Sequence, residues 1–183
     1  MEQEELLHEL CDASMLLDKH AAWAQKTYGL PKNVVCPIGR AIMGLGRCDF
    51  KSNGLYTPNP TGRKAFIIAE ATSTFLPSKI GIDEIVDLVA VPLEATDRWF
   101  LRLGRANILG LENLSIPHDR LDPIILHGTP LRWLQGGANG LCILDHRKTN
   151  AWALIRAGPI ATESAVLQQR LFAKPSVSYA TNK

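Results

Sequence analysis

Short apolar runs alternate with helix-like segments between Pro123 and Ala180, and this alternation constrains the fold more than any other feature of the chain. Thr129 followed by Pro130 is typical of an N-cap and the first residue of a helix, predicted over Leu131–Gln135. The predicted strands here are Ile124–His127, Leu141–Leu144, Ile160–Ala161 and a last strand near Val177–Ala180. Further helices are expected after Asp145 and from Thr162 to Phe172. Strands that alternate with helices favour a parallel sheet covered on both faces, so we predict an α/β fold with a mostly parallel sheet.

The N-terminal third has a different character. Apolar residues recur every three or four positions from Glu2 to about Thr27, which predicts an amphipathic helix that ends at Gly29 and Pro31. The segment 31–63 is rich in glycine and proline and is expected to be mostly loop, with a short helix near Ile38–Leu45. We therefore divide the chain into an N-terminal helical arm with a basic loop region, 1–64, and an α/β domain, 65–183. Further elements expected in the domain are strands at Ala65–Ala69, Ile85–Val91 and Arg98–Leu103, and a short helix at Arg105–Leu114.

The 183 residues contain no apolar run long enough to cross a membrane and no signal-peptide pattern at the start. The four cysteines form no C-x-x-C pair, which suits free thiols in a reducing compartment. These features predict a cytoplasmic protein that makes no contact with a membrane.

Charge is distributed unevenly along the chain. Residues 1–31 carry a net charge of −4, and residues 32–64 carry +5. Phe50 and Tyr56 lie among the cations and are candidates to stack on bases. A nucleic-acid contact is therefore possible, and its candidate residues are Arg40, Arg47, Lys51, Arg63, Lys64 and Arg102. The alternative is that the acidic helix neutralises the basic segment within a Debye length.

Four residues form the best catalytic candidate set: His127, Asp145, His146 and Glu163. They follow predicted strands, at the carboxyl edge where open α/β sheets bind ligands, and would serve as acid, base or metal-orienting groups. The alternative is structural, because Asp145 and Glu163 also stand where a helix cap or first-turn acid is expected. The glycines of 136–140 leave a helix and enter a strand, which indicates a turn and argues against a phosphate loop.

No metal-ligand spacing, P-loop or nucleophile elbow occurs, so the sequence predicts no cofactor and no metal site. Trp23 lies off the main apolar stripe of the first helix, and we interpret it as a partner-surface residue. The tryptophans at 99, 133 and 152 are expected to be core or interface anchors, with Trp133 and Trp152 on helices that face the sheet.

Three segments carry a resemblance to known proteins: GIDEIVDLVAV at 81–91, the pair Arg98–Trp99 and TPLRWLQGGANGLCILD at 129–145. Over residues 80–180 the chain resembles a group of uncharacterised bacterial proteins encountered near prophage or mobile-element replication genes. The resemblance implies an α/β domain in a phage-related context and brings no active site with it.

Together these features predict a non-enzymatic binding protein that contacts a protein partner, another copy of itself or nucleic acid. An enzyme acting on a phosphorylated or nucleotide substrate, and a structural subunit of a larger assembly, are the alternatives.

Overall fold

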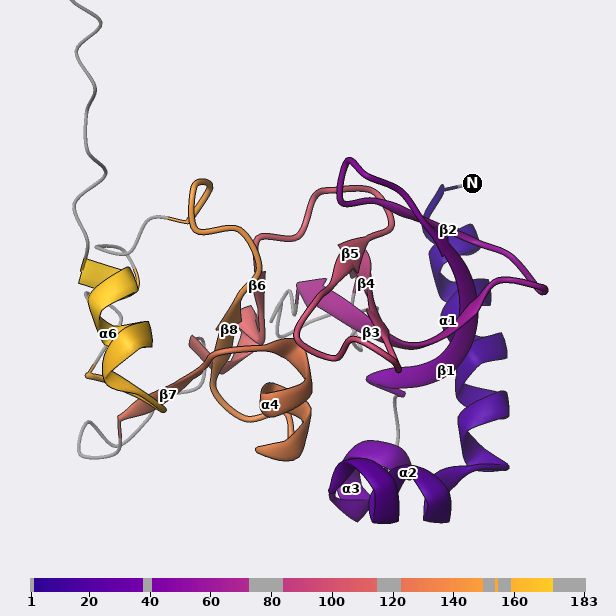
Figure 1. The fold of residues 1–183 in the computed structure, drawn as a ribbon, viewed down its shortest axis with the longest axis horizontal. Helices are drawn as coiled ribbons and strands as arrows, with labels where there is room; N and C mark the ends of the chain where they lie inside the picture. Colours follow the sequence, from indigo (N-terminus) through magenta and orange to yellow (C-terminus); the bar gives the residue numbers. More distant parts are fainter. Residues whose placement is uncertain are drawn as a thin grey trace, which may run out of the picture.

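The computed structural model describes residues 2–37, 41–72, 84–114, 123–149, 154 and 159–172. Its elements form two sheets that lie side by side along the long axis of the molecule (Figure 1). The helices are α1 (Glu2–Asp18), α2 (Ala21–Tyr28), α3 (Lys32–Val35), the 3-10 helix η1 (Leu111–Leu114), α4 (Pro130–Gln135) and α6 (Ala165–Phe172). The strands are β1 (Met43–Phe50), β2 (Tyr56–Pro58), β3 (Arg63–Thr72), β4 (Glu84–Pro92), β5 (Phe100–Leu101), β6 (Ile108–Leu109), β7 (Ile124–His127), β8 (Leu141–Ile143) and β9 (Ile160–Thr162).

The larger sheet, which we call sheet A, has the strand order β2-β1-β3-β4-β5, and every neighbouring pair is antiparallel. The sheet curls so that the turn between β1 and β2 meets β5 at the opposite edge. There the Leu101 amide donates to the Gly54 carbonyl at 3.0 Å. The prediction of a mostly parallel sheet covered by helices is therefore wrong. The pairing of β1 with β3 also joins the two sides of the boundary that we placed near residue 64.

The glycines of β1 explain why the sequence predicts a loop with a short helix where the structure has a strand. A Cβ atom at Gly44 would lie 2.3 Å from the backbone carbon of Ala13, so α1 rests directly on the strand there. At Gly46 a Cβ would lie 2.8 Å from the Ile67 side chain. Glycine is therefore needed in β1 because the helix and the neighbouring side chain pack closely on the strand. In the sequence, such glycines cannot be distinguished from the glycines of a turn.

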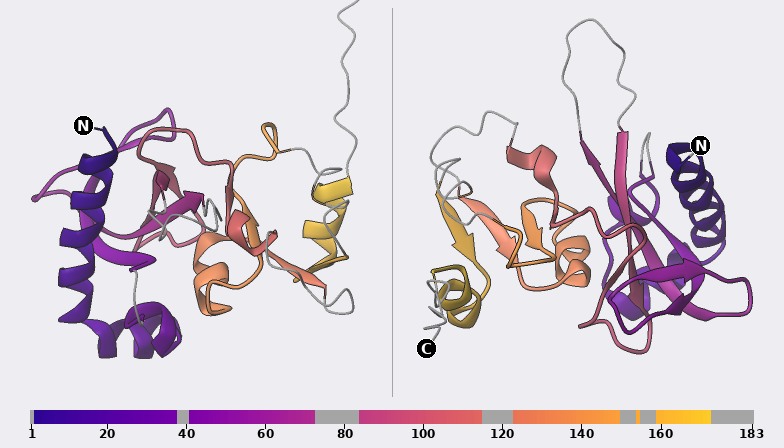
Figure 2. Two further views of the ribbon diagram at one scale, coloured as in Figure 1. Left: turned by 180° about the vertical axis from the view of Figure 1, so that it is seen from behind. Right: turned by 90° about the horizontal axis from the view of Figure 1, so that it is seen from above.

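The smaller sheet, sheet B, has the order β6-β8-β7-β9 and resembles the predicted arrangement more closely. Strand β7 is parallel to both β8 and β9, and only β6 pairs antiparallel. The Thr129 hydroxyl accepts from the Arg132 amide at 3.2 Å, which confirms the predicted cap of α4. Helix α4 lies between the two sheets (Figure 2), where Trp133 and Leu134 join a core shared by both.

Two buried acids fasten the connection between the sheets. Asp87 is fully buried and accepts four backbone N–H bonds, from residues 88, 103, 105 and 106, at 2.7–3.1 Å. Glu70 lies opposite Asp87 in the register of β3 and β4, and its Oε2 accepts from the Gly110 amide at 3.0 Å. The chain that leads from β5 to β6 is therefore bound to sheet A through carboxylates.

Other boundaries differ from the predicted ones. The first helix breaks at residues 19–20 into α1 and α2, and only Phe100–Leu101 of the expected 98–103 strand is paired. The predicted helix at 105–114 is instead β6 followed by η1. The last strand expected near 177–180 and most of the helix after Asp145 lie outside the described residues. None of the described helices is long and apolar enough to span a bilayer.

Candidate functional site

The structure joins two of the four catalytic candidates, on sheet B. His127 ends β7, and its Nδ1 lies 2.5 Å from Oε1 of Glu163, just after β9. The other ring nitrogen, Nε2, lies 2.9 Å from the Asn139 carbonyl, which can only accept. The second oxygen of Glu163 accepts from the Gly128 amide at 3.2 Å. Because both nitrogens of a 5% exposed ring are bound to protein oxygens, neither is available as a base or a metal ligand.

Asp145 and His146 do not join this pair among the contacts that the structure describes. Asp145 accepts from the backbone amide of Arg147 at 2.9 Å and from its guanidinium at 3.3 Å. Burial acts to raise the pKa of Asp145, but the hydrogen bonds and charge of Arg147, with the charge of Lys148, outweigh it and lower the pKa. His146 is exposed in the following turn. The contacts of Asp145 therefore suit a turn-forming role.

The candidate nucleic-acid residues divide into two groups. Arg102 is half-buried and bound to Glu9 of α1, with 3.1 Å between its Nε and the carboxylate Oε2. Acids of α1 also pair with Arg105, which meets Glu2 at 2.8 Å. Both arginines lie outside the basic segment 32–64, so its neutralisation by the acidic helix stays a prediction. The exposed group consists of Arg47, Lys51, Arg63 and Lys64, and Arg40 lies outside the described residues. Of the exposed group, Arg63 also faces Glu94 at 3.2 Å, and Arg47 donates to the Gly62 carbonyl.

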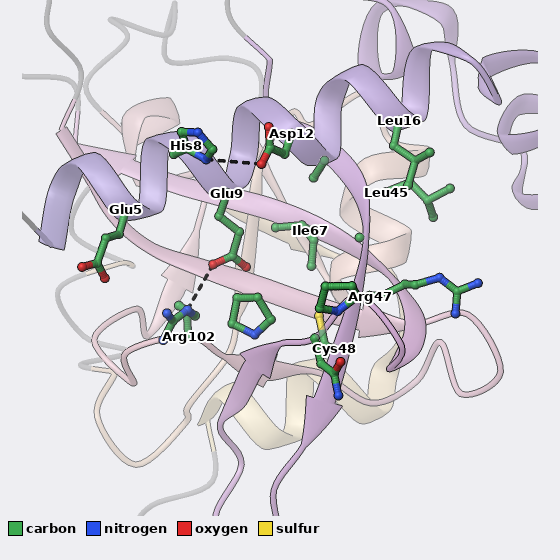
Figure 3. Close-up of a pocket in the computed structure, with 15 residues that line it drawn as sticks. Glu5, His8, Glu9, Asp12, Leu16, Leu45, Arg47, Cys48, Ile67 and Arg102 are labelled. Carbon is green, nitrogen blue, oxygen red and sulfur yellow. Dashed lines mark hydrogen bonds and ion pairs between the residues drawn. The ribbon is translucent and has the colours of Figure 1, made fainter.

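A groove of about 520 Å³ lies between α1 and sheet A (Figure 3). Its helix wall carries Glu5, His8, Glu9 and Asp12, at helical spacing. The opposite wall and floor are mainly apolar and include Leu45, Ile67, Pro58 and Pro60, and Leu16 adds apolar surface to the helix wall. This volume and lining are typical of a binding groove.

Glu9 reaches from α1 to the base of the groove, where it is held from two sides. Its Oε1 accepts from the Tyr56 hydroxyl at 2.7 Å, and its Oε2 accepts from Arg102. Burial raises the pKa of Glu9 although both hydrogen bonds oppose that rise. Burial also raises the pKa of the Cys48 thiol to about 12, so this groove residue is not a thiolate nucleophile. Tyr56, a candidate to stack on bases, is buried in this network instead.

A second feature is a set of exposed apolar side chains on α1 and α2, of which Leu16 also lines the groove. Six large apolar side chains are exposed among the described residues, and four of them belong to α1 and α2. We call this the α1–α2 face, and its members are Leu7, Met15, Leu16 and Trp23. The Trp23 ring contacts Tyr28 edge-on at 5.3 Å yet remains 39% exposed. Of these residues, the sequence identified only Trp23. The signal for two others was their spacing, because Leu7 and Met15 are eight residues apart and so lie on one side of a helix.

The described residues contain no cluster of His, Cys, Asp and Glu suited to a metal ion. Comparisons with protein-family models, with curated proteins and with solved structures gave no match.

Proposed function

We propose that this protein is a non-enzymatic binding protein, and that its α1–α2 face docks a cationic amphipathic segment of a partner protein. The observation that carries the proposal is the concentration of exposed large apolar side chains on α1 and α2. Met15 is 58% exposed and Leu7 is 53% exposed, and burying each against a partner is favourable by roughly 1.5–3 kcal/mol. Exposed large apolar side chains concentrated on one pair of helices favour an interaction site on those helices.

The charge of α1 supports the choice of a cationic partner. The helix contains six acids and no lysine or arginine. Two copies docked through this helix would place like charges together, which disfavours the self-association that we considered from the sequence. Lysine or arginine side chains at the edges of an apolar segment would instead meet Glu5 and Asp12, which line the adjoining groove.

The state of the other candidates also supports binding over catalysis. His127 is occupied on both nitrogens, and the contacts of Asp145 are with its neighbour Arg147. The groove holds a protonated thiol and a carboxylate already bound to two donors. The enzyme alternative would have to rest on His8 and Asp12, an exposed pair 3.2 Å apart that lines the groove.

The test uses two synthetic helical peptides of equal length with the same leucine stripe, one with lysine and one with glutamate on the polar face. Isothermal titration should detect binding of the lysine peptide and at least tenfold weaker binding of the glutamate peptide. The double variant Leu7→Ser with Met15→Ser should reduce binding of the lysine peptide at least tenfold. Val166→Ser on α6, which removes an exposed apolar residue elsewhere, should leave it unchanged. Equal binding of both peptides, or no effect of the double variant, would contradict the proposal.

A further inference from the structure

Two stacked aromatic rings, each contacted by an arginine, lie at the end of sheet A where β1 ends and β3 and β5 begin. The guanidinium carbon of Arg63 lies 4.6 Å from the centroid of the Phe50 ring. The Phe50 and Phe100 rings lie 4.6 Å apart and are tilted by 36°. The guanidinium carbon of Arg98 lies 5.6 Å from the centroid of Phe100. Two guanidinium groups are thus attached to the ends of one aromatic pair.

The backbone keeps this stack in place. Phe50 is the last residue of β1 and pairs with Tyr56, and Phe100 pairs with Ala90 of β4. The turn between β1 and β2 is bound to β5 through the Leu101 amide, which brings Phe50 to Phe100. Because cation–π contact already orders each arginine, less side-chain entropy is lost when a guanidinium meets a ligand.

A cavity of about 310 Å³ adjoins the stack and is lined by Lys51, Ser52, Gly54, Asp97, Arg98, Trp99 and Phe100. Lys51 and Arg98 supply positive charge from two different segments of the chain. Arg47 and Lys64 are exposed and opposite each other in the β1–β3 register, close to the same end of the sheet. Because side chains alternate along a strand, Arg47 and Lys64 lie on the opposite face of the sheet from Phe50 and Arg63. The cations on the side of the aromatic pair are therefore Lys51, Arg63 and Arg98, and the acids beside them are Glu94 and Asp97.

We propose that the Arg63–Phe50–Phe100–Arg98 stack and its adjoining cavity bind single-stranded nucleic acid. The guanidinium of Arg98, over the Phe100 ring, can offer its outer face to a base and its edge to a phosphate oxygen. Arg63, whose Nη1 faces Glu94, can offer its outer face to a second base. Two such groups suit a ligand that repeats base and phosphate along a chain, and unpaired bases are free to stack. An acidic peptide offers the charge without the planar groups. This site is separate from the α1–α2 face and does not depend on the function proposed for it.

The probe is a fluorescein-labelled 15-nucleotide oligothymidine, followed by fluorescence anisotropy between 50 and 200 mM salt. Three phosphate contacts predict a log–log salt slope of about −2, so this fourfold rise in salt should weaken binding about 20-fold. Arg98→Ala and Arg63→Ala should each weaken binding at least fivefold at 50 mM salt. Lys26→Ala, which removes an exposed cation from α2, should leave binding unchanged.

A charge-preserving variant separates stacking from simple attraction. Arg98→Lys keeps the positive charge but lacks the planar guanidinium, and it should weaken binding at least threefold. Circular dichroism and the melting temperature establish that each variant remains folded. No binding of the oligonucleotide at 50 mM salt would overturn the proposal. Equal binding by wild type and Arg98→Lys, or equal competition by polyglutamate of matched charge, would overturn the stacking site as well.

Discussion

Sheet A and sheet B differ in how their strands are specified. The short strands of sheet B follow signals that lie within a few residues of them, such as the Thr129 cap and the glycines after α4. The long strands of sheet A depend on partners that are remote in sequence, and β1 is recognised as a strand only when α1 is placed on Gly44. The two sheets also use their polar side chains differently. On sheet B, His127 and Glu163 are bound to protein groups, while sheet A and its helices present the groove, the apolar face and the cationic stack.

The largest expected effect comes from the junction between the sheets. Asp87→Ala removes the acceptor of four buried or half-buried N–H groups and should lower the free energy of unfolding by about 4 kcal/mol. Urea denaturation measures the loss. Asp87→Asn retains one acceptor oxygen and should be affected less. A loss below about 1 kcal/mol for the alanine variant, the size of one ordinary hydrogen bond, would mean that the sheets are joined by other contacts.

Close packing of α1 on sheet A predicts the next effect. In Gly44→Ala the new methyl group meets the Ala13 backbone at 2.3 Å, so the helix must move and stability should fall by about 3 kcal/mol. The matched control is Gly128→Ala in sheet B, where the nearest atom, Oε2 of Glu163, lies 3.9 Å away. Similar denaturation midpoints for the two variants would show that close packing is not the reason for glycine in β1.

Glu70 should make the junction sensitive to pH. Burial, with a smaller contribution from the charge of Glu112, raises its pKa from 4.5 to about 8, and among the described atoms its Oε1 has no hydrogen-bond partner. The folded protein keeps a proton that the unfolded chain releases, so this contribution to stability is complete below pH 4.5 and is lost as the pH rises through 8. Each unit of pKa shift corresponds to about 1.4 kcal/mol, and the total is a few kcal/mol.

The measurement is the difference in unfolding free energy between wild type and Glu70→Gln across the pH range from 4.5 to about 8. The glutamine variant stays neutral, so it should gain stability relative to wild type as the pH rises. A difference that does not change with pH would show that Glu70 is not protonated by burial.

The smallest effect is expected in sheet B. Glu163→Gln weakens the bonds to His127 and to the Gly128 amide, which link β7 to the segment after β9, and should cost about 1 kcal/mol. Gln169→Ala, an exposed change on α6, serves as the control. A gain in stability for Glu163→Gln would indicate a strained, functional pair and would revive the catalytic interpretation.

The sequence predicted most of sheet B because its boundary signals are local. Helix α4, its cap, and the positions of β7, β8 and β9 follow from Thr129, Pro130 and the apolar runs. It did not predict the antiparallel sheet A, because glycine in β1 has the composition of a turn and because the pairing of β1 with β3 has no local signature.

The candidate sites were predictable only in part. The pairing of His127 with Glu163 depends on the parallel pairing of β7 with β9, and the sequence placed both residues near one edge. Trp23 and the exposed cations were identified, but the roles of Phe100 and Arg98 were not. They come next to Phe50 and Arg63 only through the curl of sheet A, which no spacing in the sequence indicates.

The proposed function requires that a cationic peptide binds to the α1–α2 face, and that the His127–Glu163 pair of sheet B takes no part in binding. Titration of the lysine–leucine peptide into two matched double variants tests it most directly. Leu7→Ser with Met15→Ser should lose at least tenfold in affinity, while His127→Gln with Glu163→Gln, if folded by circular dichroism, should bind as wild type does. If the sheet B variant loses affinity and the α1 variant binds the peptide as wild type does, the binding site lies on sheet B, which contradicts the proposed function.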